Sequence, residues 1–287
     1  MSLTGTRDYY KPFDHPWMFD YYVQQNQMHW FPEDVPLHND VQDWQNLNED
    51  EKNLLTQIFR LSIHQHAYSL LLDTVGMPEV EYKAFSEYEA MADKHEYIKN
   101  IRVSAKDKDS VAKALAVYSA FTEGLQLFSS FIILLNFPRF GKMKGMGQII
   151  TYSIRDESLH VEAMTQLFRE YIQENIEIWT DDFKKEIYQA CRSMVDLEDR
   201  FLNLVFEMGD IQGLTKKEMQ SYIRYIADRR LLQLGLKPNY GVKENPLTWL
   251  DDVLGVEHQN FFEGRATSYM KAGLRGSVEV VNFAEIA

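Results

Sequence analysis

The chain has 287 residues, of which 45% are hydrophobic and 25% are charged, so it can bury a core as one domain or at most two. The formal net charge of −13 argues against a polyanionic partner such as nucleic acid. The single cysteine, Cys191, excludes an internal disulfide framework and any Cys₄ zinc site or iron–sulfur cluster held by this chain alone. We therefore expect a reducing, cytoplasmic setting, and the first thirty residues carry no signal or transit pattern.

Long stretches without proline or glycine predict helices joined by short loops. The first helix should begin at a capping box formed by Asn48 and Glu51, continue to Val75 and stop before Gly76. Further helices are predicted over residues 78–100, 110–135, 143–173, 181–208, 216–234 and 246–254. Strand-like alternation is nearly absent, so the predicted fold class is all-α.

The chain is expected to have three parts that differ in composition. Residues 1–37 form an arm too rich in aromatic side chains to be a solvated tail, and we expect it to pack across the helices. Residues 38–271 form the helical domain, and residues 272–287 form a flexible tail with an apolar end.

The helix predicted over residues 110–135 contains one unusual residue. Glu123 is the only charged residue between Ala114 and Phe137, so it should be buried in a central helix. A buried carboxylate is costly unless it is protonated, paired with a cation or bound to a metal. The apolar run approaches the length of a membrane span, but Gln126 and the absence of a second span favour a buried bundle helix.

The next predicted helix carries Glu157 and His160 three residues apart, so both project from one face. This E-x-x-H spacing alone is a weak signal, common on solvated helix faces. Together with Glu123 on a neighbouring helix, it predicts a carboxylate and imidazole metal site that suits iron or manganese.

In the first predicted helix, His64 and Tyr68 are four residues apart and share a face. A di-metal carboxylate bundle needs a second E-x-x-H pair. Here the position three residues before His64 is Leu61, so that pair is half missing. A tyrosine one turn beyond a metal-binding histidine is a candidate for one-electron oxidation, whereas alone it would be interpreted as a core tyrosine.

The chain resembles the radical-generating small subunit of class I ribonucleotide reductase over most of its length. The stretches that carry this resemblance are HWFPEDVPL, LLTQIFR, HQHAYSLLLDTVGMPEVEY, AFTEGLQLF, NFPRFGKMKGMGQII, SIRDESLH, YIADRRL, NPLTWLDD and NFFEGRATSYMKAG. The resemblance implies a ferritin-like helical bundle of the di-metal carboxylate type, with one bundle helix shortened or lost.

The resemblance also implies an activity. In this family a di-metal cofactor, di-iron or alternatively manganese/iron or dimanganese, is activated by oxygen and oxidises a nearby tyrosine to a stable radical. The hole then passes to a cysteine of the large subunit, where ribonucleotides are reduced to deoxyribonucleotides. The chain would thus be a subunit of a ribonucleoside-diphosphate reductase, an oxidoreductase, with the large subunit as its partner. A homodimer is also expected, and neither nucleic acid nor membrane is expected as a partner.

Matching the motifs residue by residue assigns roles within this chain. The implied metal ligands are Glu123, Glu157 and His160 for one half of the site and His64 for the other. The implied radical and transfer residues are Tyr68, Trp30, Asp156 and Tyr269. The tail beyond Tyr269 is expected to dock on the large subunit.

One departure from the family is large. In the family, LLTQIFR is followed by a helix turn with an aspartate ligand, a loop and the E-x-x-H helix, whereas here it runs directly into Leu61 and His64. The aspartate and the first glutamate have no counterpart, so the metal site is expected to be incomplete.

Three interpretations of this departure stay open: a naturally shortened or engineered subunit with an impaired or single metal site, a subunit whose full-length chain retains the segment, and a metal-independent radical subunit. The metal-independent one is the weakest, since the buried charges survive. The alternative functions are an inactive regulatory homologue that binds the large subunit without making a radical and, less favoured, an iron store or a stand-alone oxidase.

Overall fold

A computed structural model of the chain describes residues 13–62, 66–78, 88–104 and 106–250, with the single positions 3, 11, 252 and 253. Side chains are described at all of these except positions 61, 62 and 66. The chain divides into two compact units, Met1–Pro246 and Leu247–Ala287, and the helices named below all lie in the first. The predicted start of the tail at residue 272 lies outside the described residues.

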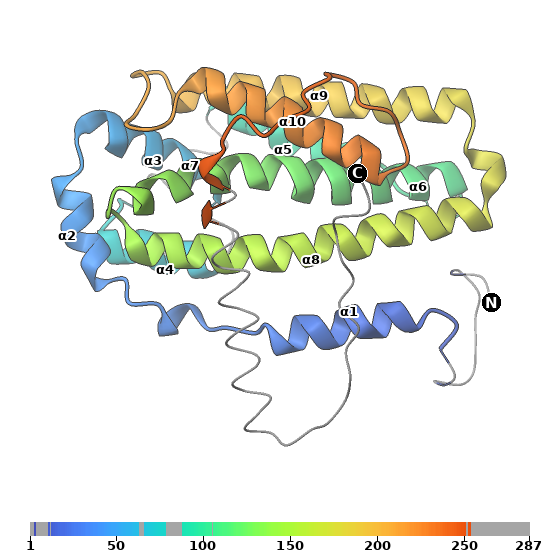
Figure 1. The fold of residues 1–287 in the computed structure, drawn as a ribbon, viewed down its shortest axis with the longest axis horizontal. Coiled ribbons are helices and arrows are strands. Elements are labelled where there is room, and N and C mark those ends of the chain that lie inside the picture. The colour runs from blue at the N-terminus through green and yellow to red at the C-terminus, as the bar shows by residue number, and fades with distance from the viewer. Residues whose placement is uncertain are drawn as a thin grey trace. The chain divides into compact units, whose positions relative to one another are not determined.

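Helices make up the first unit, and its described residues form no strand (Figure 1). The α-helices are α1 (Pro16–Gln27), α2 (His38–Asn46), α3 (Glu49–Ser62), α4 (His66–Val75), α5 (Glu89–Lys99), α6 (Lys108–Ala116), α7 (Phe128–Arg139), α8 (Lys144–Glu174), α9 (Asp181–Val205) and α10 (Lys216–Gln233). Short 3₁₀ turns, η1 (Pro32–Asp34) and η4 (Ile176–Ile178), and a π-helical segment, η3 (Val117–Leu127), complete it. The predicted all-α class is confirmed.

The centre of the bundle is a single helix formed by α6, η3 and α7. It packs against α8 on one side and against α9 and α10 on the other (Figure 1). Every residue from Phe128 to Phe137 is buried. Among the described residues it is the one helix long and apolar enough to cross a membrane, but 83% of its most apolar window is buried inside the protein. Burial of this kind is typical of a core helix, as the sequence predicted.

The prediction of one helix from 48 to 75 is wrong, because the structure contains two helices there. α3 packs against α9, whereas α4 packs against α2 and α8. The positions of the buried apolar residues explain the division. If one helix continued with the buried face of Leu55 and Phe59, that face would include position 73. Asp73 is exposed, however, and the buried residue there is Leu72. The two halves therefore present different faces to different neighbours.

The next predicted helix is also shorter than expected. α5 begins at Glu89 after an extended Tyr88, not at Pro78. Residues 79–87, over which the prediction placed its first turns, lie outside the described residues.

The N-terminus of α8 is held by two aspartates of α2. The carboxylate of Asp40 accepts hydrogen bonds from the backbone N–H groups of Gly145 (2.9 Å) and Met146 (2.6 Å), and Asp43 accepts one from Met143 (2.8 Å). These N–H groups have no partner within their own helix, and negative charge is favourable at this end of a helix. The helix that carries Glu157 and His160 is therefore fixed at its start.

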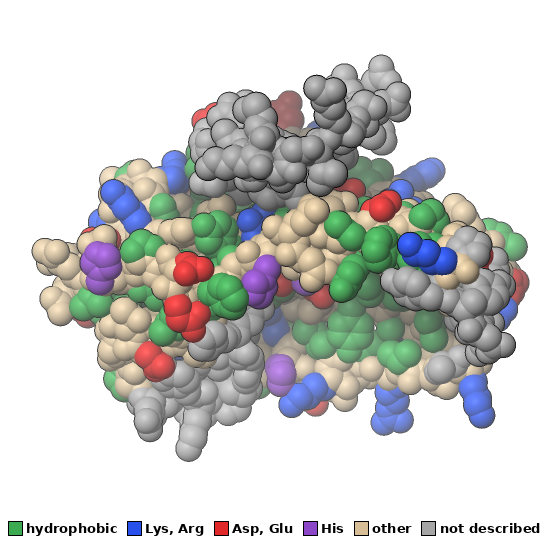
Figure 2. All heavy atoms as spheres, turned by 90° about the horizontal axis from the view of Figure 1, so that it is seen from below, with side chains coloured by type: hydrophobic (Ala, Val, Ile, Leu, Met, Phe, Trp, Pro, Cys, Tyr) green, Lys and Arg blue, Asp and Glu red, His purple; other side chains and the backbone are tan. Residues whose placement is uncertain are grey.

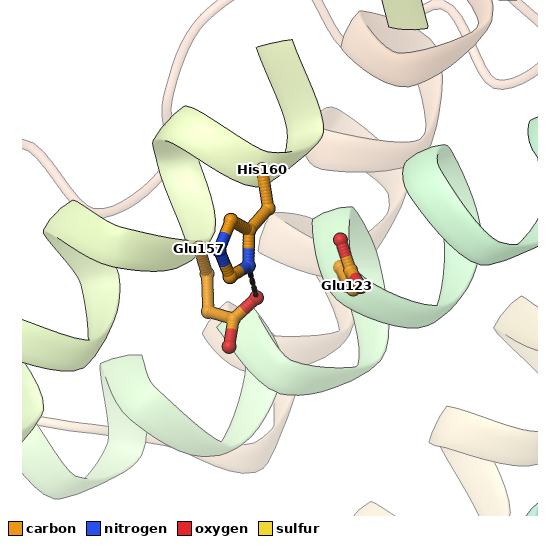
Figure 3. Close-up of side chains that lie close together, drawn as sticks. All are labelled: Glu123, Glu157 and His160. Atoms are coloured by element: carbon orange, nitrogen blue, oxygen red, sulfur yellow. Dashed lines mark hydrogen bonds and ion pairs between the residues drawn. The ribbon is translucent and has the colours of Figure 1, made fainter. Parts of the chain in front are cut away.

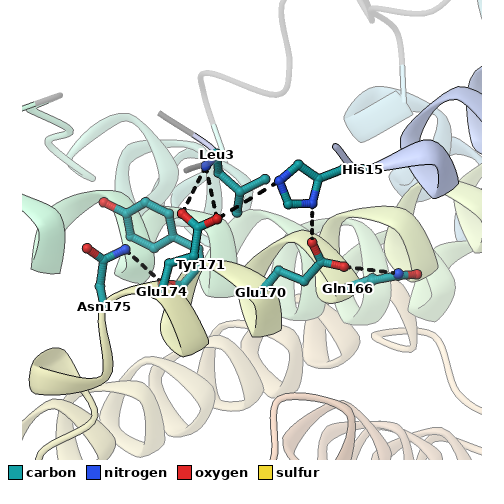
Figure 4. A network of polar contacts seen from close by, with 7 residues as sticks. All are labelled: Leu3, His15, Gln166, Glu170, Tyr171, Glu174 and Asn175. Carbon is teal, nitrogen blue, oxygen red and sulfur yellow. Dashed lines mark hydrogen bonds and ion pairs between the residues drawn. The ribbon is translucent and has the colours of Figure 1, made fainter. Parts of the chain in front are cut away.

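The described part of the N-terminal arm lies beside α8, as Figure 1 shows. At the far end of α8, His15 Nδ1 lies 2.8 Å from Glu170 Oε2, and the backbone N–H of Leu3 donates to Glu174 (Figure 4). No residue of α1 is fully buried, however, and Phe19 and Tyr22 are exposed. Figure 2, seen from below the view of Figure 1, shows hydrophobic side chains interleaved with acidic side chains and histidines on this face. Aromatic content thus predicted a contact with the bundle but not the exposure of the arm.

Candidate metal centre

Three side chains from two neighbouring helices meet at a partly exposed site in the bundle. Glu123 comes from the π-helical segment η3, and Glu157 and His160 come from one face of α8. One ligand atom from each lies within 4.8 Å of the other two (Figure 3). The sequence therefore identified a real cluster, although it did not predict that Glu123 lies in a π-helical turn, a distortion frequent at functional sites.

Contacts within the cluster are uneven. His160 Nδ1 lies 3.2 Å from Glu157 Oε2, and Figure 3 shows this pair on α8 facing Glu123. The Glu123 side chain is only half-buried, contrary to the prediction that it is buried. Its Oε2 atom is nevertheless shielded from solvent and has no hydrogen-bond partner among the described residues. The site opens toward solvent at His160, whose side chain is 44% exposed.

The electrostatics of the cluster favour a bound cation. Burial and the nearby charge of Glu157 raise the pKa of the Glu123 carboxyl, because both disfavour a second negative charge there. The hydrogen bond to Glu157 and the surrounding carboxylates raise the pKa of His160. A divalent cation would supply the positive charge that the two carboxylates lack and would give Glu123 Oε2 a partner. Two carboxylates and one imidazole are ligands that iron and manganese accept.

Tyr68 is buried on α4, against the helix that carries two members of the cluster. Its hydroxyl donates a hydrogen bond to Ser153 Oγ of α8 at 3.2 Å. Burial raises the pKa of Tyr68, and the charge of Glu157 raises it further. The phenol is therefore kept neutral, dry and close to the candidate ligands.

Trp30 and Asp156 are in direct contact. The indole Nε1 of Trp30 donates to Asp156 Oδ2 at 2.9 Å, and its ring packs on Tyr152 with ring centroids 5.1 Å apart. Arg155 donates to the carbonyl of Met28, which holds the segment before Trp30 against α8.

Other assigned residues lie outside the described part of the chain, namely His64 and Tyr269, together with the tail. Sequence reasoning also missed Ser153 and Tyr152, the side chains that contact Tyr68 and Trp30. A small polar residue one turn before Glu157 was the available signal for Ser153, but serine is too common on helices for that spacing to be specific.

Comparisons with known proteins give a family match over most of the chain. The family model "Ribonucleotide reductase, small chain" matches residues 7–62 and 54–246, in two segments that overlap at 54–62. A protein of Invertebrate iridescent virus 6, "Probable ribonucleoside-diphosphate reductase small subunit 376L", is 36% identical over an alignment of 351 residues that covers 96% of this chain and 98% of the relative.

Two solved structures share the fold. One is a putative class I ribonucleotide reductase from Bacillus halodurans, with a TM-score of 0.77 and 23% identity over 83% of this chain and 99% of the other. The second is a ribonucleotide reductase R2 subunit from Clostridium botulinum, with a TM-score of 0.75 and 24% identity over 83% of this chain and 87% of the other. Because the family model covers most of the helical unit that carries Glu123, Glu157 and His160, the chain belongs to the ribonucleotide reductase small-chain family.

Proposed function

We propose that this chain is the small subunit of a class I ribonucleoside-diphosphate reductase, an oxidoreductase that reduces ribonucleotides together with a large subunit. Family membership supports the assignment. The single observation that carries it within this chain is the Glu123, Glu157 and His160 cluster beside the buried Tyr68.

Glu123, Glu157 and His160 would hold one cation, iron or manganese. The Oε2 atom of Glu123 fits this role, because it is shielded from solvent, has no donor among the described residues and would gain a partner when a cation binds. When bound, the metal supplies the oxidising chemistry that converts a tyrosine to a radical in this family. His64 would belong to the second half of the site.

Tyr68 would be the residue that stores the radical. Its burial excludes water and reductants, and the hydrogen bond to Ser153 fixes the position of the phenol oxygen. A neutral phenol must lose a proton as well as an electron when it is oxidised, and the raised pKa of Tyr68 keeps the proton in place until then.

Trp30 and Asp156 would begin the route to the large subunit, and Tyr269 would carry the hole across the interface. The 2.9 Å contact between Trp30 Nε1 and Asp156 supports this, because the carboxylate orients the indole and can stabilise positive charge on it. We further propose that the active form is a homodimer bound to the large subunit.

We also propose that a segment of the family sequence is missing near residues 60–64. The two family matches overlap at 54–62, and the alignment of 351 residues with the viral relative exceeds the 287 residues of this chain. α3 ends at Ser62 and α4 begins at His66, at the same place. The second half of the metal site would then lack its aspartate and one glutamate.

The experiment compares this chain with a family-length version in which the missing segment of the viral relative is inserted between Arg60 and His64. Both are loaded with Fe²⁺ and oxygen, examined by electron paramagnetic resonance and titrated with a class I large subunit. We expect both to bind the large subunit, and only the family-length chain to give a strong tyrosyl signal and turnover.

Tyr68→Phe in the family-length chain is the control, and it should abolish the signal without weakening large-subunit binding. Failure of both chains to bind the large subunit would contradict the proposal. A full tyrosyl signal from the shorter chain would instead show that the second half of the site is not impaired.

A further inference from the structure

Gly124 follows the candidate ligand Glu123 and lies in direct contact with an arginine of another helix. The Nε of Arg230, on α10, donates a hydrogen bond of 2.8 Å to the carbonyl oxygen of Gly124. A Cβ atom at position 124 would lie 2.5 Å from this Nε. Glycine is unfavourable inside a helix, so its presence here is explained by the close approach of Arg230.

The carbonyl of Gly124 lies near the C-terminal end of the π-helical segment η3. In an α-helix its partner would be the N–H of Phe128, but that N–H donates to the carbonyl of Leu125 instead. Where a π-helical pattern returns to an α-helical one, the backbone has one carbonyl more than it has N–H groups. Arg230 supplies a side-chain hydrogen bond to one of the carbonyls at the end of η3, where this surplus arises.

Arg230 is well placed for this single task. Its side chain is almost fully buried, and its guanidinium packs on the ring of Phe128 with a distance of 5.1 Å to the ring centroid. A second nitrogen, Nη1, is held by Gln233 Oε1 at 2.9 Å. Among the described residues, no carboxylate lies within ion-pair distance of Arg230, so its visible acceptors are a backbone carbonyl and an amide. A buried arginine is costly, and this cost is consistent with a specific role for its donors.

We propose that Arg230 is a positioning residue for the metal centre. By holding the carbonyl of Gly124, it fixes the π-helical register of η3 and so directs the Glu123 carboxylate toward Glu157 and His160. This inference rests on the proposed function insofar as it assigns a metal to the cluster. Its structural part, the stabilisation of η3, holds for the metal-free chain as well.

The test uses two variants that break the contact from opposite sides. Arg230→Met removes the donors but keeps much of the length and apolar surface, and Gly124→Ala forces the guanidinium away while it retains every donor. Arg224→Met is the matched control, because Arg224 is also on α10 but pairs with Asp199 of α9 at 2.6 Å. Each purified chain is titrated with Mn²⁺, and hydrogen exchange of amides 120–130 is measured without metal.

We expect Arg230→Met and Gly124→Ala to weaken Mn²⁺ binding by about 10- to 100-fold, as loss of a supporting contact does in other metal sites. Both should also speed amide exchange in η3, whereas Arg224→Met should change neither. Arg230→Lys keeps one donor and should recover part of the affinity. If Arg230→Met does not fold, Gly124→Ala decides the question.

Unchanged affinity and exchange in the contact variants would overturn the positioning role while leaving the proposed function intact. A wild-type chain that binds no Mn²⁺ would overturn the proposed metal site, and the role of Arg230 toward it would fall with it. The exchange measurement distinguishes the two failures, because it reports on η3 alone.

Discussion

The hydroxyl of Tyr68 and the hydroxyl of Ser153 are joined by a hydrogen bond of 3.2 Å, and Ser153 precedes Glu157 by one turn of α8. The same helix face therefore carries the anchor of the phenol and a candidate metal ligand. Any shift of α4 against α8 would move Tyr68 relative to the cluster. This is the physical reason why the packing of these two helices matters for the proposed radical.

The burial of Tyr68 predicts a specific response to alkaline pH. The folded chain holds the Tyr68 phenol proton more tightly than the unfolded chain, whose tyrosines titrate at about pH 10. Stability should therefore be retained below that pH and fall above it, by up to about 1.4 kcal/mol per pH unit for this residue. In Tyr68→Phe, urea unfolding should show a smaller loss of stability between about pH 9 and pH 11.

Tyr22→Phe is the control for this measurement, because Tyr22 is 63% exposed and its replacement removes no buried hydroxyl. Stability curves of wild type and Tyr68→Phe that run parallel over this range would show that the Tyr68 phenol is not protected from ionisation in the folded chain.

Because Trp30 contacts Asp156, we expect the Trp30→Phe variant to lose turnover while it keeps metal binding. In Trp30→Phe the indole donor is lost and the carboxylate oxygen it served is left unpaired, which should cost about 1–3 kcal/mol of stability. Mn²⁺ binding should be unchanged, because Trp30 is outside the ligand cluster. Turnover of the family-length chain with the large subunit should be lost.

Trp44→Phe is the matched control for this variant, since Trp44 packs on Phe59 of α3. Normal turnover in Trp30→Phe would exclude Trp30 from the transfer route.

We expect replacement of Asp40, which is outside the candidate metal centre, to lower the stability of the chain strongly. Asp40 is completely buried and accepts two N–H groups at the start of α8. Asp40→Ala leaves both groups buried without a partner, so we expect a loss of about 2–4 kcal/mol in the free energy of unfolding. Asp50→Ala, at an exposed position in the first turn of α3, should cost less than about 1 kcal/mol by the same urea measurement.

Sequence periodicity predicted the helical class and the central helix, because an apolar run with one carboxylate has few other structural solutions. Sequence periodicity could not predict that α3 and α4 are separate helices, since neither proline nor glycine interrupts the sequence near Ser62 and His66. Only the change in which face is apolar shows that the two helices pack against different neighbours. The π-helical turn at Glu123 was equally hidden from the sequence, because the carbonyl of the adjacent Gly124 is held by Arg230, which lies 106 residues after Gly124 in the chain.

The titration behaviour of the cluster predicts how metal binding depends on pH. Metal must displace the protons that Glu123 and His160 hold more tightly than usual, so affinity for Mn²⁺ should fall as pH is lowered from neutral. Calorimetric titrations at several pH values would measure this and the number of protons released. An affinity that does not change with pH would contradict binding at these two residues.

The last prediction concerns how many cations the chain binds. Glu123, Glu157 and His160 offer three protein ligands for one cation, whereas the proposed second half would retain only His64 of its own ligands. Titration with Mn²⁺ should therefore give one tight site per chain and, at most, a second that is much weaker. Glu123→Gln should abolish the tight site, because a neutral amide cannot replace the charge of the carboxylate. Glu162→Gln is the control: Glu162 is at an exposed position on α8, and its replacement should leave the tight site unchanged. Two equally tight sites in this 287-residue chain would mean that the second half is complete and that the proposed loss of ligands near residues 60–64 is wrong.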